Sequence, residues 1–260
     1  MITSANNTQV KNVIQLNQKA KARREQGLFV AEGRKMFGEA PRDWISKVYV
    51  TESLTSDTAL MELVNVLPEG KAEIVADNVF RQMCDTKTPQ GILTVLKKPI
   101  WTAADILKGE APLVMVLEDL QDPGNAGTIF RTGEGAGVSG VFLTKTCVDI
   151  TNPKVIRSTM GSVYRMPFLY VEDVVSLKSE LKQKGIRTFA AHLKGKNSYD
   201  EEDYRKASAF LIGNEGNGLR DEVADQAQVY IRIPMKGQVE SLNAAVATAI
   251  LTFEAARQRR

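Results

Sequence analysis

From residue 113 onward the sequence alternates short apolar runs with helical stretches, and this alternation constrains the fold more than any other feature. The run 113–117 is apolar at every position, as expected of a strand that is buried on both faces of a sheet. The other runs with strand character are 141–143, 188–191, 210–212 and 230–233. Strands that alternate with helices predict a parallel sheet between helical layers, so we expect an α/β fold.

The first 98 residues carry shorter helix and strand signals. Apolar residues recur at helical spacing from Val10 to Leu16. Strands are expected at 28–31, 48–50 and 92–96. The composition changes at Lys97-Lys98-Pro99. We therefore expect a small α/β domain over residues 1–98, a linker over 99–112 with one short helix, and a larger α/β domain over 113–260.

Several classes of protein are excluded by what the sequence lacks. The 260 residues contain two cysteines, Cys84 and Cys147, and one histidine, His192, which argues against a disulfide framework and against a metal site. No apolar run approaches the ~20 residues of a membrane-spanning helix. The N-terminus lacks the basic stretch and apolar core of a signal peptide. We therefore expect a cytoplasmic protein that binds no metal and no membrane.

Positive charge is concentrated near the N-terminus, although the net charge of +3 by itself says little about partners. The basic residues there are Lys11, Lys19, Lys21, Arg23, Arg24, Arg34 and Lys35. Clustered cations suit a nucleic-acid backbone, because each phosphate contact releases condensed counterions. A solvated helix face explains the cluster as well, and on the cluster alone we favour that explanation.

The segment 121–132 directly follows the strand 113–117 and opens a helix. Asn125 can cap that helix and leave free backbone amides at its N-terminus. Arg131 lies about two turns further along the same helix. A helix N-terminus beside a guanidinium favours phosphate binding, whereas an ordinary turn followed by a surface arginine is the alternative.

Glycines crowd the segment 213–219, which directly follows the expected strand 210–212. Gly213, Gly216 and Gly218 allow the backbone to approach a ligand closely or to adopt positive φ, and an ordinary strand-to-helix turn is the alternative. A dinucleotide-binding loop does not fit, because only one strand follows and it ends without the acid that would hold a ribose. No Gly-Lys-Ser/Thr phosphate loop occurs.

A third polar segment joins the strand 230–233 to a long final helix. Pro234 ends the strand, and Ser241 or Asn243 stands where the helix begins. This polar pair can cap the helix or bind substrate, and capping alone is the alternative. The helix carries a broad, alanine-rich apolar stripe, which predicts close packing on the sheet or on another subunit.

Together the three segments resemble, in order and spacing, the signature motifs of the SpoU (TrmH) family of RNA ribose 2′-O-methyltransferases. The matching residues are Asn125, Gly127 and Arg131, then Gly213, Glu215, Gly216 and Gly218, then Ile233-Pro234-Met235, Gly237, Ser241-Leu242-Asn243 and Ala247. Gly133 and Gly135 depart from the alanine-rich helix usual in the family and are expected to loosen its end. Residues 1–98 resemble the family's substrate-binding domain, which is similar to a ribosomal protein.

The resemblance implies a C-terminal trefoil knot of SPOUT type, a homodimer, S-adenosylmethionine as methyl donor, and RNA as substrate, with ribosomal RNA favoured over transfer RNA. The implied donor-binding residues are Gly213, Asn214, Gly216, Gly218, Ile233, Met235 and Leu242. The implied catalytic residues are Arg131, Asn125, Glu215, Ser241 and Asn243. The implied RNA contacts are Lys19, Lys21, Arg23, Arg24, Arg34 and Arg157.

We expect Arg131 to bind an RNA phosphate and polarise the ribose hydroxyl, because an arginine that stays protonated is a poor base. Glu215 is expected to orient Arg131 or the glycine-rich segment, while Ser241 and Asn243 position the ribose. Two other functions stay open: a catalytically idle RNA-binding or ribosome-assembly factor on the same fold, and a small-molecule nucleotide enzyme. The retained polar motif residues argue against the first, and the separate basic domain argues against the second.

Overall fold

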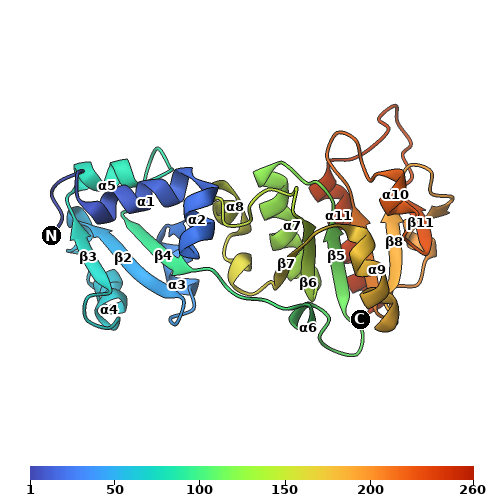
Figure 1. Cartoon of the computed structure of the whole chain (residues 1–260), viewed down its shortest axis with the longest axis horizontal. Helices are drawn as coiled ribbons and strands as arrows, with labels where there is room; N and C mark the ends of the chain where they lie inside the picture. The colour runs from blue at the N-terminus through green and yellow to red at the C-terminus, as the bar shows by residue number, and fades with distance from the viewer. The chain divides into compact units, whose positions relative to one another are not determined.

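The computed structural model describes all residues from 1 to 260, and the chain divides into two compact units. Unit 1 contains Met1–Ile100 together with Asp149–Tyr164. Unit 2 contains Trp101–Val148 together with Arg165–Arg260. Figure 1 shows the chain with most of its helices and strands labelled. No helix has both the length and the apolar character needed to span a membrane.

Unit 1 is built on a sheet of four strands in the order β1-β4-β2-β3. The strands are β1 (Leu28–Glu32), β2 (Ile45–Thr51), β3 (Ala72–Val75) and β4 (Ile92–Lys97). β4 runs antiparallel to β1 and β2, whereas β3 pairs in parallel with β2. The three strands expected from the sequence are present. β3 was not predicted, because its four residues are mostly half-buried and carry no clear alternation.

Five helices surround this sheet. They are α1 (Thr8–Gln18), α2 (Ala20–Gln26), α3 (Arg34–Glu39), α4 (Thr58–Asn65) and α5 (Asp77–Met83), with a 3-10 turn at Glu52–Leu54. α1 and α5 lie on the same side of the sheet (Figure 1). Val10, Val13 and Leu16 are spaced to fall on one face of α1, and all three are buried against sheet residues such as Val95.

The segment Asp149–Tyr164 leaves the C-terminal half of the sequence and packs into unit 1. It holds α8 (Pro153–Thr159) and a 3-10 turn at Ser162–Tyr164. The hydroxyl of Tyr164 donates to the Met36 carbonyl at 3.1 Å, and Asp149 accepts from the Arg23 guanidinium at 2.9 Å. Residues far from the N-terminus in sequence therefore complete the core of the N-terminal unit.

Unit 2 contains a sheet of seven strands in the order β7-β6-β5-β10-β8-β11-β9, and every neighbouring pair is parallel. The strands are β5 (Leu113–Leu117), β6 (Gly140–Thr144), β7 (Phe168–Val171), β8 (Arg187–Ala191), β9 (Asn197–Ser198), β10 (Ser208–Ile212) and β11 (Val229–Arg232). The central strands β5, β6 and β10 are buried at every position, which matches their uninterrupted apolar sequences. The predicted parallel α/β sheet is confirmed.

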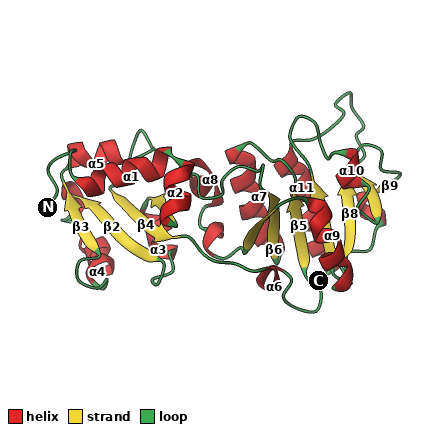
Figure 2. Cartoon of the chain, viewed as in Figure 1, coloured by secondary structure: helices red, strands yellow, loops and turns green.

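Helices cover both faces of this sheet, as Figure 2 shows. They are α6 (Ala103–Ile106), α7 (Pro123–Ala136), α9 (Val174–Gln183), α10 (Asp221–Ala224) and α11 (Ala244–Gln258), with a 3-10 turn at Tyr199–Glu201. Residues of α6, α9 and α10 share one core with the β5 side chains Val114 and Val116. α7 and α11 pack together on the opposite face.

The expectation that Gly133 and Gly135 loosen the end of α7 is wrong. The helix runs through both glycines to Ala136, and Gly137 ends it in the left-handed conformation, with φ 79°. A Cβ at position 133 would lie 2.6 Å from the Met115 methyl group. Gly133 therefore serves the close packing of α7 on β5, and this packing offsets its poor helix propensity.

Candidate functional site

A cavity of about 280 Å³ lies where β8, β10 and β11 end. The carboxyl edge of a parallel sheet is the usual place for a ligand in this class of fold. All seven residues predicted to bind the methyl donor line the cavity: Gly213, Asn214, Gly216, Gly218, Ile233, Met235 and Leu242. Glu215 and Ser241 line it as well. Two segments that are separate in sequence, 213–219 and 231–244, thus form the two sides of one pocket.

Residues 213–219, called here the glycine-rich loop, form a closed turn. The backbones of Asn214 and Gly218 exchange two hydrogen bonds, of 3.1 and 2.9 Å. The Asn214 side-chain oxygen accepts from the backbone of Gly216 at 2.8 Å and of Asn217 at 3.1 Å. A Cβ on Gly213 would lie 2.1 Å from the Gly218 carbonyl carbon, so only glycine fits at position 213.

Three polar residues, one from each predicted motif, form a continuous chain of hydrogen bonds. The Asn125 amide donates to Glu215 Oε1 at 3.1 Å. The Asn243 amide in turn donates to Asn125 Oδ1 at 2.9 Å. We call Glu215, Asn125 and Asn243 the polar chain. It joins the start of α7, the glycine-rich loop and the start of α11 through hydrogen bonds between residues 90 and 118 positions apart in sequence.

Glu215 holds the first turn of α7 against the glycine-rich loop. Its carboxylate accepts the backbone N–H of Gln121 at 3.2 Å and of Asp122 at 2.9 Å, in addition to the Asn125 amide. Partial burial opposes ionisation of Glu215, but these donors outweigh it and lower the pKa of the carboxyl group. Glu215 is therefore an ionised acceptor with little basicity, suited to fixing the loop.

The helix α7 is capped by Asp122 and not by Asn125 as the sequence suggested. Asp122 Oδ1 accepts the backbone N–H of Asn125 at 2.7 Å, and Pro123 occupies the first helical position. Asn125 therefore sits inside the first turn, where its side chain is free to join the polar chain. Asn243 caps α11 as expected, with its oxygen accepting from Ala245 at 2.9 Å and Val246 at 3.3 Å.

Arg131 and Ser241 are exposed and take no part in the polar chain. Arg131 extends from α7 and forms no hydrogen bond or ion pair, so its guanidinium is available to a ligand. No contact joins Arg131 to Glu215, whose oxygens are occupied by the start of α7. Ser241 lines the cavity and leaves its hydroxyl unbonded.

The predicted RNA-contact residues of unit 1 differ sharply in exposure, and the prediction that Arg23 contacts RNA is wrong. Its residue exposure is only 3%. Its guanidinium bonds Asp149 at 2.9 Å and the Leu16 carbonyl at 2.7 Å, so Arg23 stabilises the unit and cannot reach RNA. Lys19 and Arg24 are exposed without an ion pair. The remaining candidates are exposed but paired: Lys21 with Glu25, Arg34 with Asp57 and Arg157 with Asp85.

Some residues of the pocket were missed from the sequence. His192 follows β8 and lines the cavity, with Nδ1 accepting the Lys194 backbone N–H at 3.1 Å and Nε2 3.6 Å from Asp221. Arg232 and Glu240 also line it. Their places after β8 and β11, at the carboxyl edge of a parallel sheet, were the available signal. The order in which strands meet at that edge could not be read from the sequence.

Comparison with known families agrees with this geometry. A model of the SpoU rRNA methylase family matches residues 112–253, which is more than half of the chain. The chain belongs to the SpoU family. A second model, of the MRM3-like substrate-binding domain, matches residues 7–94. The resemblance seen in the three motifs is therefore confirmed, and the SpoU match covers all of them.

Members of the SpoU family and related proteins resemble this chain over nearly its whole length. A tRNA/rRNA methyltransferase of Synechocystis, itself uncharacterised, is 32% identical and covers 99% of this chain and 94% of its own. RlmP of Bacillus subtilis, a 23S rRNA (guanosine(2553)-2′-O)-methyltransferase, is 32% identical, with 97% of each chain covered. The crystal structure of an rRNA methyltransferase from Sinorhizobium meliloti with AdoMet bound has a TM-score of 0.87 and 32% identity, covering 98% of this chain and 97% of its own.

Proposed function

We propose that this SpoU-family protein transfers a methyl group from S-adenosylmethionine to a ribose 2′-hydroxyl of RNA, with ribosomal RNA as the favoured substrate. The observation that carries the proposal is the polar chain, which brings one residue from each motif together beside the cavity. The B. subtilis relative, named as a 2′-O-methyltransferase of 23S rRNA, supports the choice of substrate.

The residues that line the cavity suit the chemistry of the methyl donor. Apolar side chains such as Ile233, Leu242 and Leu219 line it and suit the adenine ring. Nothing lies within 4 Å of a Cβ placed on Gly218, so a ligand can approach the main chain closely there. The donor supplies a sulfonium methyl that is already activated for transfer. Binding and orientation are the work left to the protein.

The chain's own residues must hold the ribose hydroxyl and favour loss of its proton. Arg131, exposed and without a partner, binds an RNA phosphate beside the target ribose and polarises the hydroxyl. Ser241 and the polar chain position the ribose, with Asn125 and Asn243 fixed by their mutual hydrogen bond. Glu215 holds the loop through hydrogen bonds that lower the pKa of its carboxyl group. The hydroxyl proton passes to phosphate or water.

Several further properties belong to the proposal. Unit 1 binds RNA through exposed cations, namely Lys19, Lys21, Arg24, Arg34 and Arg157. The protein acts as a homodimer in the cytoplasm without a metal, and exposed apolar side chains of α11, Val246 and Phe253, support self-association. The C-terminal part of unit 2 forms a trefoil knot. The boundaries 1–98, 99–112 and 113–260 stay a prediction for the domains.

Transfer of labelled methyl to RNA tests the function. Purified protein is incubated with labelled S-adenosylmethionine and bulk ribosomal or transfer RNA from cells that lack the gene. The RNA is then digested to nucleosides. We expect label on a ribose oxygen of ribosomal RNA. Label on transfer RNA would change the substrate class, label on a base would overturn the mechanism, and bound donor without transfer to any RNA or precursor particle would indicate the idle RNA-binding factor.

A further inference from the structure

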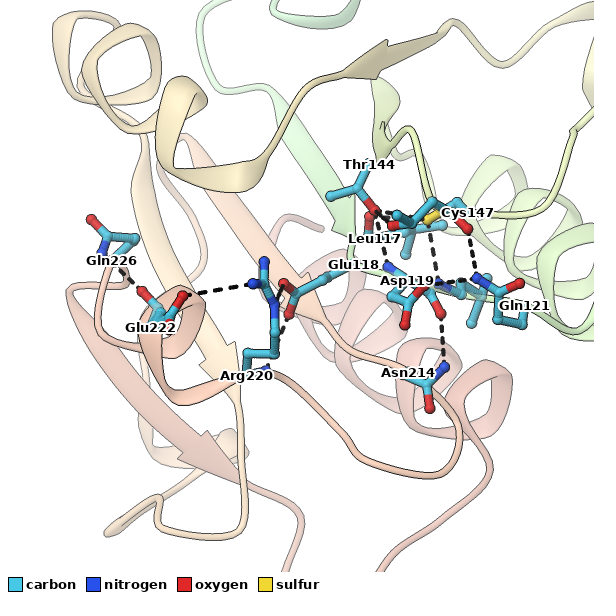
Figure 3. Close-up of polar contacts among 12 residues, drawn as sticks. Leu117, Glu118, Asp119, Gln121, Thr144, Cys147, Asn214, Arg220, Glu222 and Gln226 are labelled. Atoms are coloured by element: carbon cyan, nitrogen blue, oxygen red, sulfur yellow. Dashed lines mark hydrogen bonds and ion pairs between the residues drawn. The ribbon is translucent and has the colours of Figure 1, made fainter.

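Two consecutive residues just beyond β5 hold both ends of the glycine-rich loop. Glu118 accepts two hydrogen bonds from Arg220, the residue that directly follows the loop: 2.6 Å from Nε and 3.1 Å from the backbone N–H. The Asp119 carbonyl accepts the Asn214 amide at 2.8 Å. Figure 3 shows Glu118 and Arg220 facing each other, with Asn214 directed at Asp119.

The backbone that carries Glu118 and Asp119 is itself fixed. Asp119 is one of two non-glycine residues with positive φ, at 52°, a conformation that L-residues rarely adopt. Its N–H donates to Thr144 Oγ1 at 3.0 Å, and its carboxylate accepts the Gln121 amide at 2.7 Å. Strain of this kind persists only where the surroundings impose it. The segment is therefore a rigid base for the loop.

Cys147 forms hydrogen bonds with the same segment. Its sulfur accepts the Leu120 backbone N–H at 3.3 Å and donates to the Leu117 carbonyl at 3.3 Å. Burial raises the pKa of the Cys147 thiol, so the proton needed for the second bond is kept. The contacts link the end of β5 to the turn after β6 (Figure 3).

The glycine-rich loop depends on these anchors because its internal bonds close it on itself. The Asn214–Gly218 pair makes the loop one body. Asn214, Glu215 and the adjoining Arg220 bond it to the segment 118–122, which follows β5. Leu219, next to Arg220, is buried and forms part of the cavity wall. Movement of the Arg220 end would therefore move the wall of the pocket.

Resting on the proposed function, we propose that Glu118 is a positioning residue for the methyl donor. It acts through its pair with Arg220, together with the Asp119–Asn214 contact. These contacts hold the glycine-rich loop in the position in which the pocket binds the donor. The Glu118 side chain is only 3% exposed, whereas the Arg220 side chain is 60% exposed. A buried carboxylate is costly unless it is paired. Here the pair fixes a loop that lines the cavity.

The chain contains a matched control for this pair. Glu202 is also a largely buried carboxylate, with its side chain 9% exposed, and pairs with the half-exposed Arg187 at 2.8 Å. Both residues belong to unit 2, and neither lines the donor cavity. Glu202→Gln therefore removes a comparable ion pair without touching the glycine-rich loop.

The test is calorimetric titration of S-adenosylhomocysteine into the full-length wild type and into Glu118→Gln, Arg220→Ala, Arg220→Lys and Glu202→Gln, with the melting temperature of each. We expect Glu118→Gln and Arg220→Ala to raise Kd about tenfold or more. Arg220→Lys should recover part of that loss, and Glu202→Gln should stay within about twofold of wild type. A tenfold change in Kd corresponds to about 1.4 kcal/mol.

The outcomes separate this inference from the proposed function. Wild-type binding with an unchanged Kd in folded Arg220→Ala and Glu118→Gln would overturn the positioning role and leave the function standing. An equal loss in Glu202→Gln would also overturn it, since the effect would then be general. Absence of binding by the wild type would remove the proposed function and this inference together. If Glu118→Gln does not fold, the two variants Arg220→Ala and Arg220→Lys decide the test, because Arg220→Ala keeps the hydrogen bond from the backbone N–H of residue 220 to Glu118.

Discussion

The basic helices of unit 1 and the site of unit 2 use their polar side chains in opposite ways. In unit 2 the motif residues bond mainly to one another, so that Glu215, Asn125 and Asn243 stand in place before any ligand arrives. Among the predicted RNA contacts of unit 1, Arg23 is buried and structural. The exposed cations are free or hold single surface ion pairs. The proposed chemistry therefore uses side chains that are already held in place, whereas the proposed RNA contacts of unit 1 are exposed charges.

Loss of Arg131 should have the largest effect, because Arg131 is an exposed cation without an ion pair on α7, the helix that also carries Asn125. Arg131→Ala should lower kcat by about 10³-fold, the scale of a lost charge-stabilising donor. Donor Kd should stay within about twofold, since Arg131 does not line the cavity. Single-turnover methylation and calorimetry measure the two quantities.

Arg131→Lys distinguishes the role of the guanidinium from that of charge alone. Lysine keeps the charge but loses the planar, two-pronged donor that binds phosphate. We expect most of the activity to be lost. Full activity in Arg131→Lys would contradict a bidentate phosphate contact, and a donor Kd that rises as much as kcat falls would move Arg131 into the donor pocket.

Arg23 and its neighbour Arg24 give the next largest effect, on stability. Arg23→Ala leaves Asp149 without its cation and should lower the free energy of unfolding by about 3 kcal/mol or more. Arg24→Ala removes an exposed side chain with no ion pair and should change it by no more than about 0.5 kcal/mol. Urea denaturation measures both. Equal stability of the two variants would mean that the Arg23–Asp149 pair adds nothing to unit 1.

This pair also shows how far the sequence could lead. Five of the seven strands of unit 2 could be predicted, because their sequences contain apolar runs such as 113–117 in β5 and 210–212 in β10. The mostly half-buried β7 and the two-residue β9 were not predicted. The residues predicted to bind the methyl donor could be named because the spacing of the motifs resembles that of the SpoU family. Arg23 could not be assigned correctly, because its partner Asp149 lies more than 120 residues away. The sequence of a helix does not show whether one of its arginines faces solvent or pairs with a carboxylate that is distant in sequence.

The anchors of the site show the same limit. Glu118 and Arg220 are unremarkable in sequence and meet only because β5 and β10 are neighbours in the sheet. The cap of α7 was misassigned to Asn125 because two residues of capping type, Asp122 and Asn125, stand one turn apart. Local signals placed the helix but could not choose between them.

The Asn125–Asn243 hydrogen bond gives a smaller and more specific test of preorganisation. Asn125→Ala and Asn243→Ala should each lower kcat, by about tenfold to a hundredfold. If the two residues act through their shared bond, the double variant should lose less than the product of the two, with a coupling energy of about 1 kcal/mol. If the decrease in kcat of the double variant equals the product of the two single decreases, each amide contacts the ribose independently of the other. Melting temperatures control for the loss of the α11 cap in Asn243→Ala.

The smallest effect is expected from the exposed cations of unit 1, and it concerns RNA binding only. Lys19→Gln and Arg24→Gln should each weaken RNA binding by a few fold and reduce the salt dependence of log K by about one, because each phosphate contact releases about one counterion. Lys47→Gln is a matched control, since this lysine is held by Glu73 and by the Gly70 carbonyl within unit 1. Titration of a labelled ribosomal RNA fragment at several salt concentrations measures the slope. If the salt dependence of log K is the same in Lys19→Gln, Arg24→Gln, Lys47→Gln and the wild type, α1 and α2 do not contact RNA. Unit 2 would then bind the substrate.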